Sequence, residues 1–145
     1  IIIFIYSSMI RFLAKLPPVD FFRGIVDAMA VSYSTASSNA TLPVTLRCAE
    51  RNLGVSPSVS SFVISLGATI NMNGTAMYLG LATLFGAQIF GVVPLETIAF
   101  VAGVDRIMDM MRTTTNVSGD AAVAVTVAAM TGELDREELI SADDV

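Results

Sequence analysis

Hydrophobic residues fill most of the chain, and short polar segments interrupt them. The run IIIFIYSSMI opens the sequence, and Pro17–Pro18 follow shortly after it. Because proline cannot continue a helix, this pattern predicts the end of a transmembrane helix over residues 1–16. Helical patterns then cover residues 18–53 and enclose the Ser-, Thr- and Asn-rich stretch 32–43. Two half-helices joined by a polar turn, with charges only at their outer ends, predict a re-entrant hairpin.

The longest uncharged segment lies between Arg51 and Glu96 and contains the polar motif ATINMNGT. This segment is long enough to cross a hydrocarbon layer of about 30 Å. The polar motif interrupts its apolar pattern from Thr69 to Gly74. Non-helical backbone at membrane depth survives only where protein buries it or a polar cavity surrounds it. Residues 57–91 are therefore predicted to form a broken transmembrane helix.

A polar stripe marks the last long segment, residues 94–130, which is predicted to be a polar transmembrane helix. Its members follow one another at steps of 4, 3, 4 and 4: Asp105, Asp109, Arg112, Asn116 and Asp120. On a helix they fall within an arc of roughly 80°. Residues 131–145 form an acidic tail, for which we expect a cytoplasmic, solvated position.

The composition favours an all-α membrane protein. The 145 residues are 54% hydrophobic and 14% charged, with a mean hydropathy of +0.71, whereas soluble domains carry about 25% charged residues. The net charge of -5 comes mostly from the acidic tail, and no basic patch indicates nucleic acid as a partner. One cysteine and no histidine exclude disulfide frameworks, Cys/His zinc sites and His-dependent triads. Basic residues near the ends of the hairpin predict a cytoplasmic face there.

A polar stripe of this kind has three interpretations. It could be the solvated face of a soluble helix, but ionisable groups inside a membrane bundle mark a substrate or ion path. An intramembrane aspartyl hydrolase would need a facing carboxylate pair that shares a proton, and three aspartates on one helix with an intervening arginine do not resemble one. Asp109 and Arg112 can instead hold an amine and a carboxylate, while the oxygens of Asn116 and Asp120 suit Na⁺.

Three motifs carry a resemblance to a known family. SSNATLPVT, GATINMNGTAMY and DRIMDMMRTTTNVSGD resemble, in order and spacing, segments of the dicarboxylate/amino acid:cation symporter family, the sodium-coupled glutamate and aspartate transporters. The resemblance runs from about residue 17 to residue 129. It implies a secondary transporter rather than an enzyme, with an elevator-type transport domain, a homotrimeric assembly, no cofactor, and a multi-pass position in a plasma or bacterial inner membrane.

The resemblance also implies roles for individual residues. Substrate would be bound by Ser37 and Ser38 at the hairpin tip, by Thr75, and by Asp109, Arg112, Thr113 and Asn116 on the last helix. Asp109 would bind the substrate's amine and Arg112 its side-chain carboxylate, which favours aspartate or glutamate and leaves a related dicarboxylate open. Sodium ions would be bound by Gly67, Thr69, Asn71, Asn73 and Asp120.

The chain departs from the family pattern at three places. Asn73 stands where many relatives have aspartate, which leaves Na⁺ or H⁺ coupling and its stoichiometry open, and Ala36 replaces a polar tip residue. A second re-entrant hairpin needs about 25–30 residues, but only 14 separate Phe90 from Asp105. The joint falls near Gly91–Val92. We therefore expect impaired transport by this chain, with an inert membrane remnant or a dominant-negative fragment as the alternative.

Overall fold

The computed structural model describes residues 2–72, 74–76, 78 and 95–135, and these are almost entirely helical. Within those residues the β-structure is limited to one isolated antiparallel bridge between Val55 and Leu134. The all-α fold class is thus confirmed for the described part of the chain. No helix in that part combines the length and the apolar character needed to cross a membrane.

The N-terminal helix consists of two π-helical segments, η1 (Ile2–Tyr6) and η2 (Ile10–Ala14), with the short α1 (Ser7–Met9) between them. It ends at Lys15, whose left-handed backbone (φ 57°) terminates the helix. Helix α2 (Pro18–Gly24) begins directly after Pro17. Proline suits the first turn of a helix because that turn leaves its N–H groups without intrahelical partners.

Helices α3 (Val26–Thr35) and α4 (Ser38–Arg51) form a tight hairpin. Ala36 ends α3 in a left-handed conformation (φ 51°), and the Ser37 hydroxyl caps α4 by accepting from the Ala40 N–H at 3.3 Å. The prediction of a polar turn over residues 32–43 was wrong in extent, because only two residues leave the helices. Serine and threonine hydroxyls in this stretch bond to carbonyls three or four residues earlier, which satisfies them within helices.

Helix α5 (Pro57–Ile70) starts with a Ser56 cap and ends at Asn71, whose backbone (φ −85°, ψ 65°) is not helical. Residues 74–76 are helical again. The expected interruption from Thr69 to Gly74 is therefore narrower than the sequence pattern indicated, and Asn73 lies outside the described residues. Helix α7 (Leu95–Thr131) is continuous over 37 residues.

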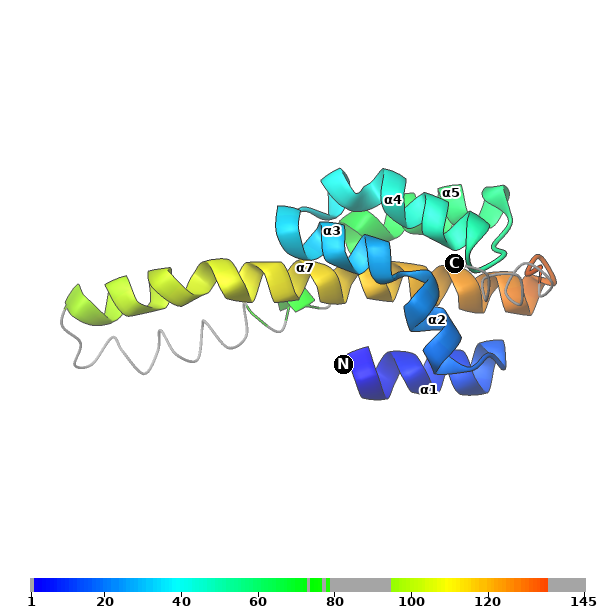
Figure 1. The fold of residues 1–145 in the computed structure, drawn as a ribbon, viewed down its shortest axis with the longest axis horizontal. Helices are drawn as coiled ribbons and strands as arrows, with labels where there is room; N and C mark the ends of the chain where they lie inside the picture. The colour runs from blue at the N-terminus through cyan, green and yellow to red at the C-terminus, as the bar shows by residue number, and fades with distance from the viewer. Residues whose placement is uncertain (1, 73, 77, 79–94, 136–145) are drawn as a thin grey trace.

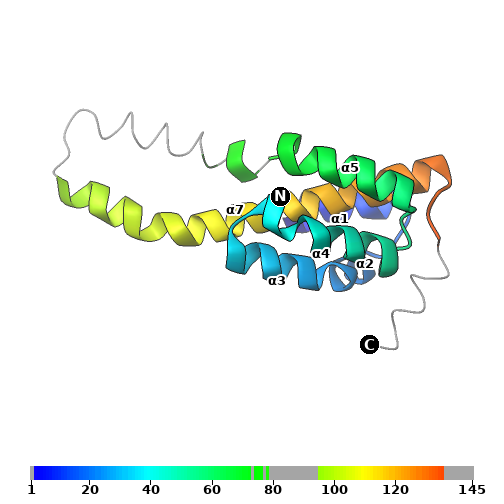
Figure 2. The same ribbon diagram turned by 90° about the horizontal axis from the view of Figure 1, so that it is seen from above.

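The long helix α7 is the axis of the described structure (Figure 1). Helices α3, α4 and α5 pack along its C-terminal part, and η1 and η2 contact it from another side. Figure 2 shows α5 and the α3–α4 pair flanking α7 in the turned view. The core between these helices includes Phe21, Ile25, Leu53, Ile64 and Val125.

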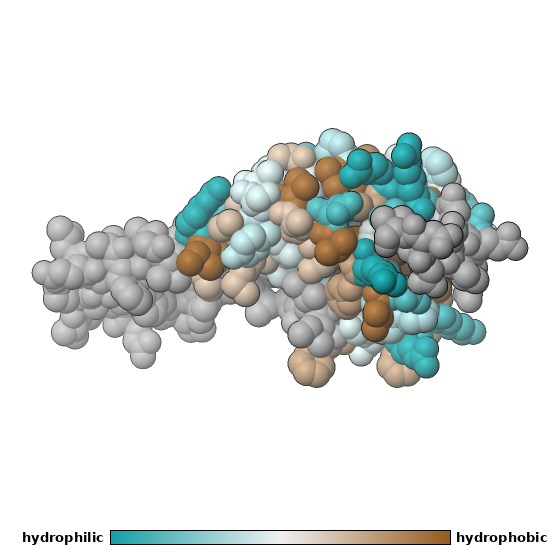
Figure 3. All heavy atoms as spheres, viewed as in Figure 1, coloured by the Kyte–Doolittle hydropathy of each residue, from teal (hydrophilic) through white to brown (hydrophobic). Residues whose placement is uncertain are grey.

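Large hydrophobic side chains also cover much of the outer surface. Phe4, Phe12, Phe62 and Ile70 are each more exposed than buried, at 81%, 75%, 69% and 70%. Hydrophobic residues therefore lie among hydrophilic ones on the face drawn in Figure 3.

Candidate functional site

The polar stripe predicted on the last helix lies on the middle of α7. Helical spacing places Asp109, Arg112, Asn116 and Asp120 on one side, where α5 and the segment after it pass. Burial increases along the stripe: Asp109 and Arg112 are half-buried, whereas Asn116 and Asp120 are 4% and 2% exposed. Asp105 belongs to the α7 backbone, but its side chain is not among those described.

The Asp120 carboxylate lies against the end of α5. The Asn71 amide donates to its Oδ1 at 3.0 Å. A Cβ added to Gly67 would be 2.5 Å from the same oxygen, so the helices approach this closely only because residue 67 is glycine. No arginine or lysine in the described residues lies within ion-pair distance of Asp120. A buried carboxylate with an amide as its described partner suits a bound cation, since burying an uncompensated charge is costly.

Asn116 joins α7 to the segment after the break. Its Oδ1 accepts from the Gly74 N–H at 2.8 Å, and its amide donates to the Thr75 hydroxyl at 3.1 Å. Both ends of one amide are thus used to hold residues 74 and 75. Asn71 contacts Asp120 and Thr75 contacts Asn116, so the described residues on both sides of the break lie against two successive turns of α7.

The charged part of the stripe forms an ion pair. The Arg112 guanidinium donates to the Asp109 carboxylate through two nitrogens, and it lies over the Tyr78 ring, 4.5 Å from the centroid. Arg106 also approaches Asp109, at 3.9 Å. Thr113 is buried, and its hydroxyl donates to the Asp109 carbonyl at 3.0 Å. A guanidinium held partly by a ring and partly by one carboxylate keeps the planar fork that a second carboxylate can accept.

The remaining predicted residues lie at the margin of this group. Ser37 and Ser38 are half-buried at the α3–α4 tip, and the described bonds of Ser37 stay within the hairpin. The hairpin reaches α7 through buried Ser32, whose hydroxyl donates to the Thr114 hydroxyl at 3.3 Å. Thr69 is exposed near the end of α5.

The sequence interpretation missed two members of the group. Tyr78 stacks on Arg112, and the Gly74 N–H is a donor to Asn116. Both occur inside the motif GATINMNGTAMY. Their positions next to predicted ligands in this motif were the only sequence signal that could have indicated them. Pairing them with α7 required the helix packing, which the motif alone does not give.

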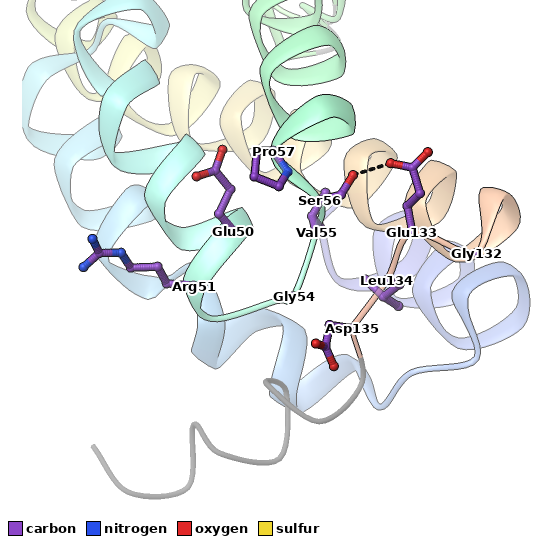
Figure 4. A pocket seen from close by; sticks show the side chains of 10 residues that line it. All are labelled: Glu50, Arg51, Gly54, Val55, Ser56, Pro57, Gly132, Glu133, Leu134 and Asp135. Atoms are coloured by element: carbon purple, nitrogen blue, oxygen red, sulfur yellow. Dashed lines mark hydrogen bonds between the residues drawn. The ribbon is translucent and has the colours of Figure 1, made fainter.

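A wide, shallow pocket of about 820 Å³ lies elsewhere, where the α4–α5 loop meets the end of α7 (Figure 4). Two of its carboxylates already have partners: Glu133 accepts hydrogen bonds from the Ser56 and Ser58 hydroxyls, and Glu50 accepts one from Ser60. These two serine bonds lower the pKa of the exposed Glu133 below its ordinary value. We call this contact, residues 54–58 with 132–135, the loop clamp; it ties elements together and is a weaker candidate for ligand binding.

Comparison with known proteins agrees with the motifs. The model of the Sodium:dicarboxylate symporter family matches residues 1–93 and 91–130. The chain is 38% identical over 144 residues to Excitatory amino acid transporter 2 of Homo sapiens, covering 72% of the chain and 25% of that protein. It is 35% identical over 147 residues to Excitatory amino acid transporter of Caenorhabditis elegans (74% and 29%). Identity to Excitatory amino acid transporter 1 of Homo sapiens is 34% over 166 residues (87% and 30%).

The chain spans only about a quarter to a third of the length of these relatives. The family match nevertheless covers nearly all of the chain before its acidic tail, including the three motifs and the polar face of α7. The family consists of transporters and not enzymes, which removes the aspartyl hydrolase from consideration. On this evidence the chain belongs to the Sodium:dicarboxylate symporter family.

Proposed function

We propose that this chain is part of the transport domain of a sodium-coupled symporter for acidic amino acids or related dicarboxylates. The observation that carries the proposal is the pairing of the broken segment after α5 with the polar face of α7. Buried Asp120 and Asn116 each bind a different end of the segment 71–75. The residues on either side of this break can then respond to a cation at one end and to a substrate at the other.

The cation would bind at the Asp120 end of this segment. Sodium prefers hard oxygen ligands, and the Asp120 carboxylate, the side chain of Asn71 and the backbone at Gly67 supply them within one small region. Further ions would take oxygens from Thr69 and Asn73. Cation binding would neutralise a carboxylate that is 2% exposed, which stabilises the packing of α5 against α7.

The substrate would bind at the Arg112 end. Its side-chain carboxylate would replace the Asp109 carboxylate on the guanidinium, which frees Asp109 to bind the amine. Asn116, Thr113 and Thr75 would supply neutral donors and acceptors. Ser37 and Ser38, at the hairpin tip, would complete the site. Asn116 also binds Gly74 and Thr75, so an ion that fixes these residues would favour substrate binding. Bound substrate would raise the affinity for the ion by the same factor.

The proposed architecture follows the family. Residues 1–16 would end a transmembrane helix, 18–53 would form the re-entrant hairpin, 57–91 the broken helix and 94–130 the polar helix, with a cytoplasmic tail at 131–145. Family membership supports a membrane location, and we propose a multi-pass cell-membrane protein. The assembly would be an elevator-type homotrimer surrounded by the lipid bilayer.

The alignments to the relatives are longer than the part of this chain that they cover. The alignment to the human transporter 2 extends over 144 positions but covers 72% of the 145 residues, which is about 104, so about 40 positions are unmatched. The two parts of the family match meet at residues 91–93, next to the expected joint at Gly91–Val92. This agreement supports the proposal that the extracellular gate hairpin is missing and that transport by this chain is impaired. The alternative remains an inert or dominant-negative membrane remnant.

Two measurements on the purified chain separate these proposals. Sodium should raise the thermal unfolding midpoint of the reconstituted chain more than choline does, and L-aspartate should raise it further only when sodium is present. Asp120→Asn should abolish the sodium effect, and Arg112→Lys the aspartate effect, whereas Arg106→Lys serves as the control. Sodium-driven uptake of labelled aspartate into proteoliposomes should be absent. A chain that inserts but shows neither ligand effect is the inert remnant; uptake at the rate of a complete relative would overturn the proposed impairment.

A further inference from the structure

Tyr6 is a buried tyrosine on the N-terminal helix whose hydroxyl reaches α7. Its side chain is 3% exposed, although its neighbours Phe4 and Ile5 lie on the outer surface. The Tyr6 hydroxyl donates to the Thr115 carbonyl at 3.2 Å. In a helix that carbonyl also accepts from the N–H of residue 119, so Tyr6 contacts the turn of α7 that leads directly into Asp120.

Gly119 allows Tyr6 and Asn71 to meet at this turn. A Cβ added to Gly119 would lie 2.5 Å from the Tyr6 hydroxyl and 3.0 Å from the Asn71 amide nitrogen. Both polar atoms therefore face the same point on α7, and a larger residue there would push them away. The phenol and the amide come from elements far apart in the sequence, η1 and the segment after α5.

The Asn71 side chain projects from the point where α5 ends. The Asn71 N–H still bonds to the Gly67 carbonyl at 2.8 Å, but its own backbone is not helical, so the helix does not by itself fix where the amide lies. Its amide nitrogen donates to Asp120 and lies beside the Tyr6 hydroxyl over Gly119. A rigid ring, locked in the core and bonded to the α7 backbone, restricts where that amide can go.

We propose that Tyr6 is a positioning residue for the cation site formed by Asn71 and Asp120, with Gly119 as the contact that makes this possible. The inference rests on the proposed function, because it assumes that Asn71 and Asp120 bind sodium. Tyr6 itself acts on the ion through Asn71 and through the α7 backbone. Removal of a partner that orients a ligand typically lowers cation affinity by about 10–100-fold.

The test is a sodium titration of the whole purified chain in lipid nanodiscs. The thermal unfolding midpoint is measured at each sodium concentration, and choline chloride keeps the ionic strength constant. Tyr6→Phe keeps the packed ring and removes only the hydroxyl, so its midpoint in choline should stay close to the original. Its apparent sodium dissociation constant should rise about tenfold. Tyr33→Phe, on the exposed face of α3, is the matched control and should leave that constant unchanged.

Gly119→Ala gives a second, independent variant. The added methyl should displace both the phenol and the amide and should weaken sodium affinity at least as much as Tyr6→Phe. Equal sodium affinity in Tyr6→Phe and the original chain would overturn the positioning role, as would a midpoint loss of the same size in sodium and in choline. If the original chain shows no sodium-specific stabilisation, the proposed function itself fails, and that result is distinct from either of the other two.

Discussion

The middle and the end of α7 both bind the neighbouring segments through polar groups, but they do so differently. In the middle, single side chains with little solvent access make the contacts: Asp120 binds Asn71, and Asn116 binds Gly74 and Thr75. At the loop clamp the exposed Glu133 binds two hydroxyls, and backbone bonds run beside it, from Ser56 to Glu133 and from Asp135 to Gly54.

This difference bears on which polar groups are suited to ligand binding. A buried carboxylate or amide pays the full desolvation cost if its partner is lost, so its environment is sensitive to an ion or substrate. An exposed carboxylate beside backbone bonds can exchange its partner for water at little cost. The middle of α7 should therefore respond strongly to small changes, and the clamp should tolerate them.

Gly67→Ala should give the largest effect, because it acts on the buried contact between α5 and the middle of α7. The added Cβ would lie 2.5 Å from the Asp120 Oδ1, and overpacking costs up to about 3 kcal/mol. Alanine gains about 1 kcal/mol in helix propensity, so we expect a net loss of about 2 kcal/mol in the free energy of unfolding. Denaturant unfolding in detergent measures it.

The control for this variant is Ser65→Ala, on the exposed side of the same helix two residues earlier. It should change the free energy of unfolding by less than about 0.5 kcal/mol. A Gly67→Ala chain that is more stable than the original would mean that α5 can move away from Asp120 freely. The middle of α7 would then tolerate small changes as well as the loop clamp does.

The sequence predicted these contacts only in part. The charge spacing along residues 109–120 correctly indicated one polar face, since helical periodicity is a local property, whereas the side chain of Asp105 lies outside the described residues. The contact between Gly67 and Asp120, which are 53 residues apart in the sequence, could not be read from that spacing, because it depends on how closely α5 and α7 approach each other. The hairpin turn was predicted too long, because Ser, Thr and Asn favour turns in general, whereas here tertiary packing keeps most of them in helices.

Ala36→Gly should have an intermediate effect on stability. It tests whether the tip of the α3–α4 hairpin resembles the sensitive middle of α7 or the tolerant loop clamp. Ala36 has a left-handed backbone (φ 51°), which costs an L-residue with a Cβ about 1–2 kcal/mol. Glycine adopts this conformation readily, so the variant should gain about 1 kcal/mol in the free energy of unfolding. Ala40→Gly, on the exposed face of α4, should instead lose about 1 kcal/mol.

Thermal unfolding of the two variants side by side checks the sign as well as the size of this difference. If both glycine variants lose stability equally, the tip is not strained. The α3–α4 hairpin, which reaches the middle of α7 through Ser32 and Thr114, would then resemble the tolerant clamp more than the sensitive site.

Glu133→Gln should have the smallest effect, because it acts on the exposed clamp. Its two serine bonds lower the pKa of Glu133, so their contribution to stability is present above the ordinary glutamate pKa. It is lost as the pH falls from there through the lowered pKa of the folded state. The original chain should be slightly more stable than the variant at neutral pH, and the difference should vanish in acid. Ser58→Ala, which removes one of the two donors, should reduce this pH dependence without abolishing it. A large loss in the free energy of unfolding at neutral pH would contradict this expectation. It would show that the backbone bonds from Ser56 and Asp135 do not hold the loop clamp alone, and that an exposed carboxylate can contribute as much to stability as a buried one.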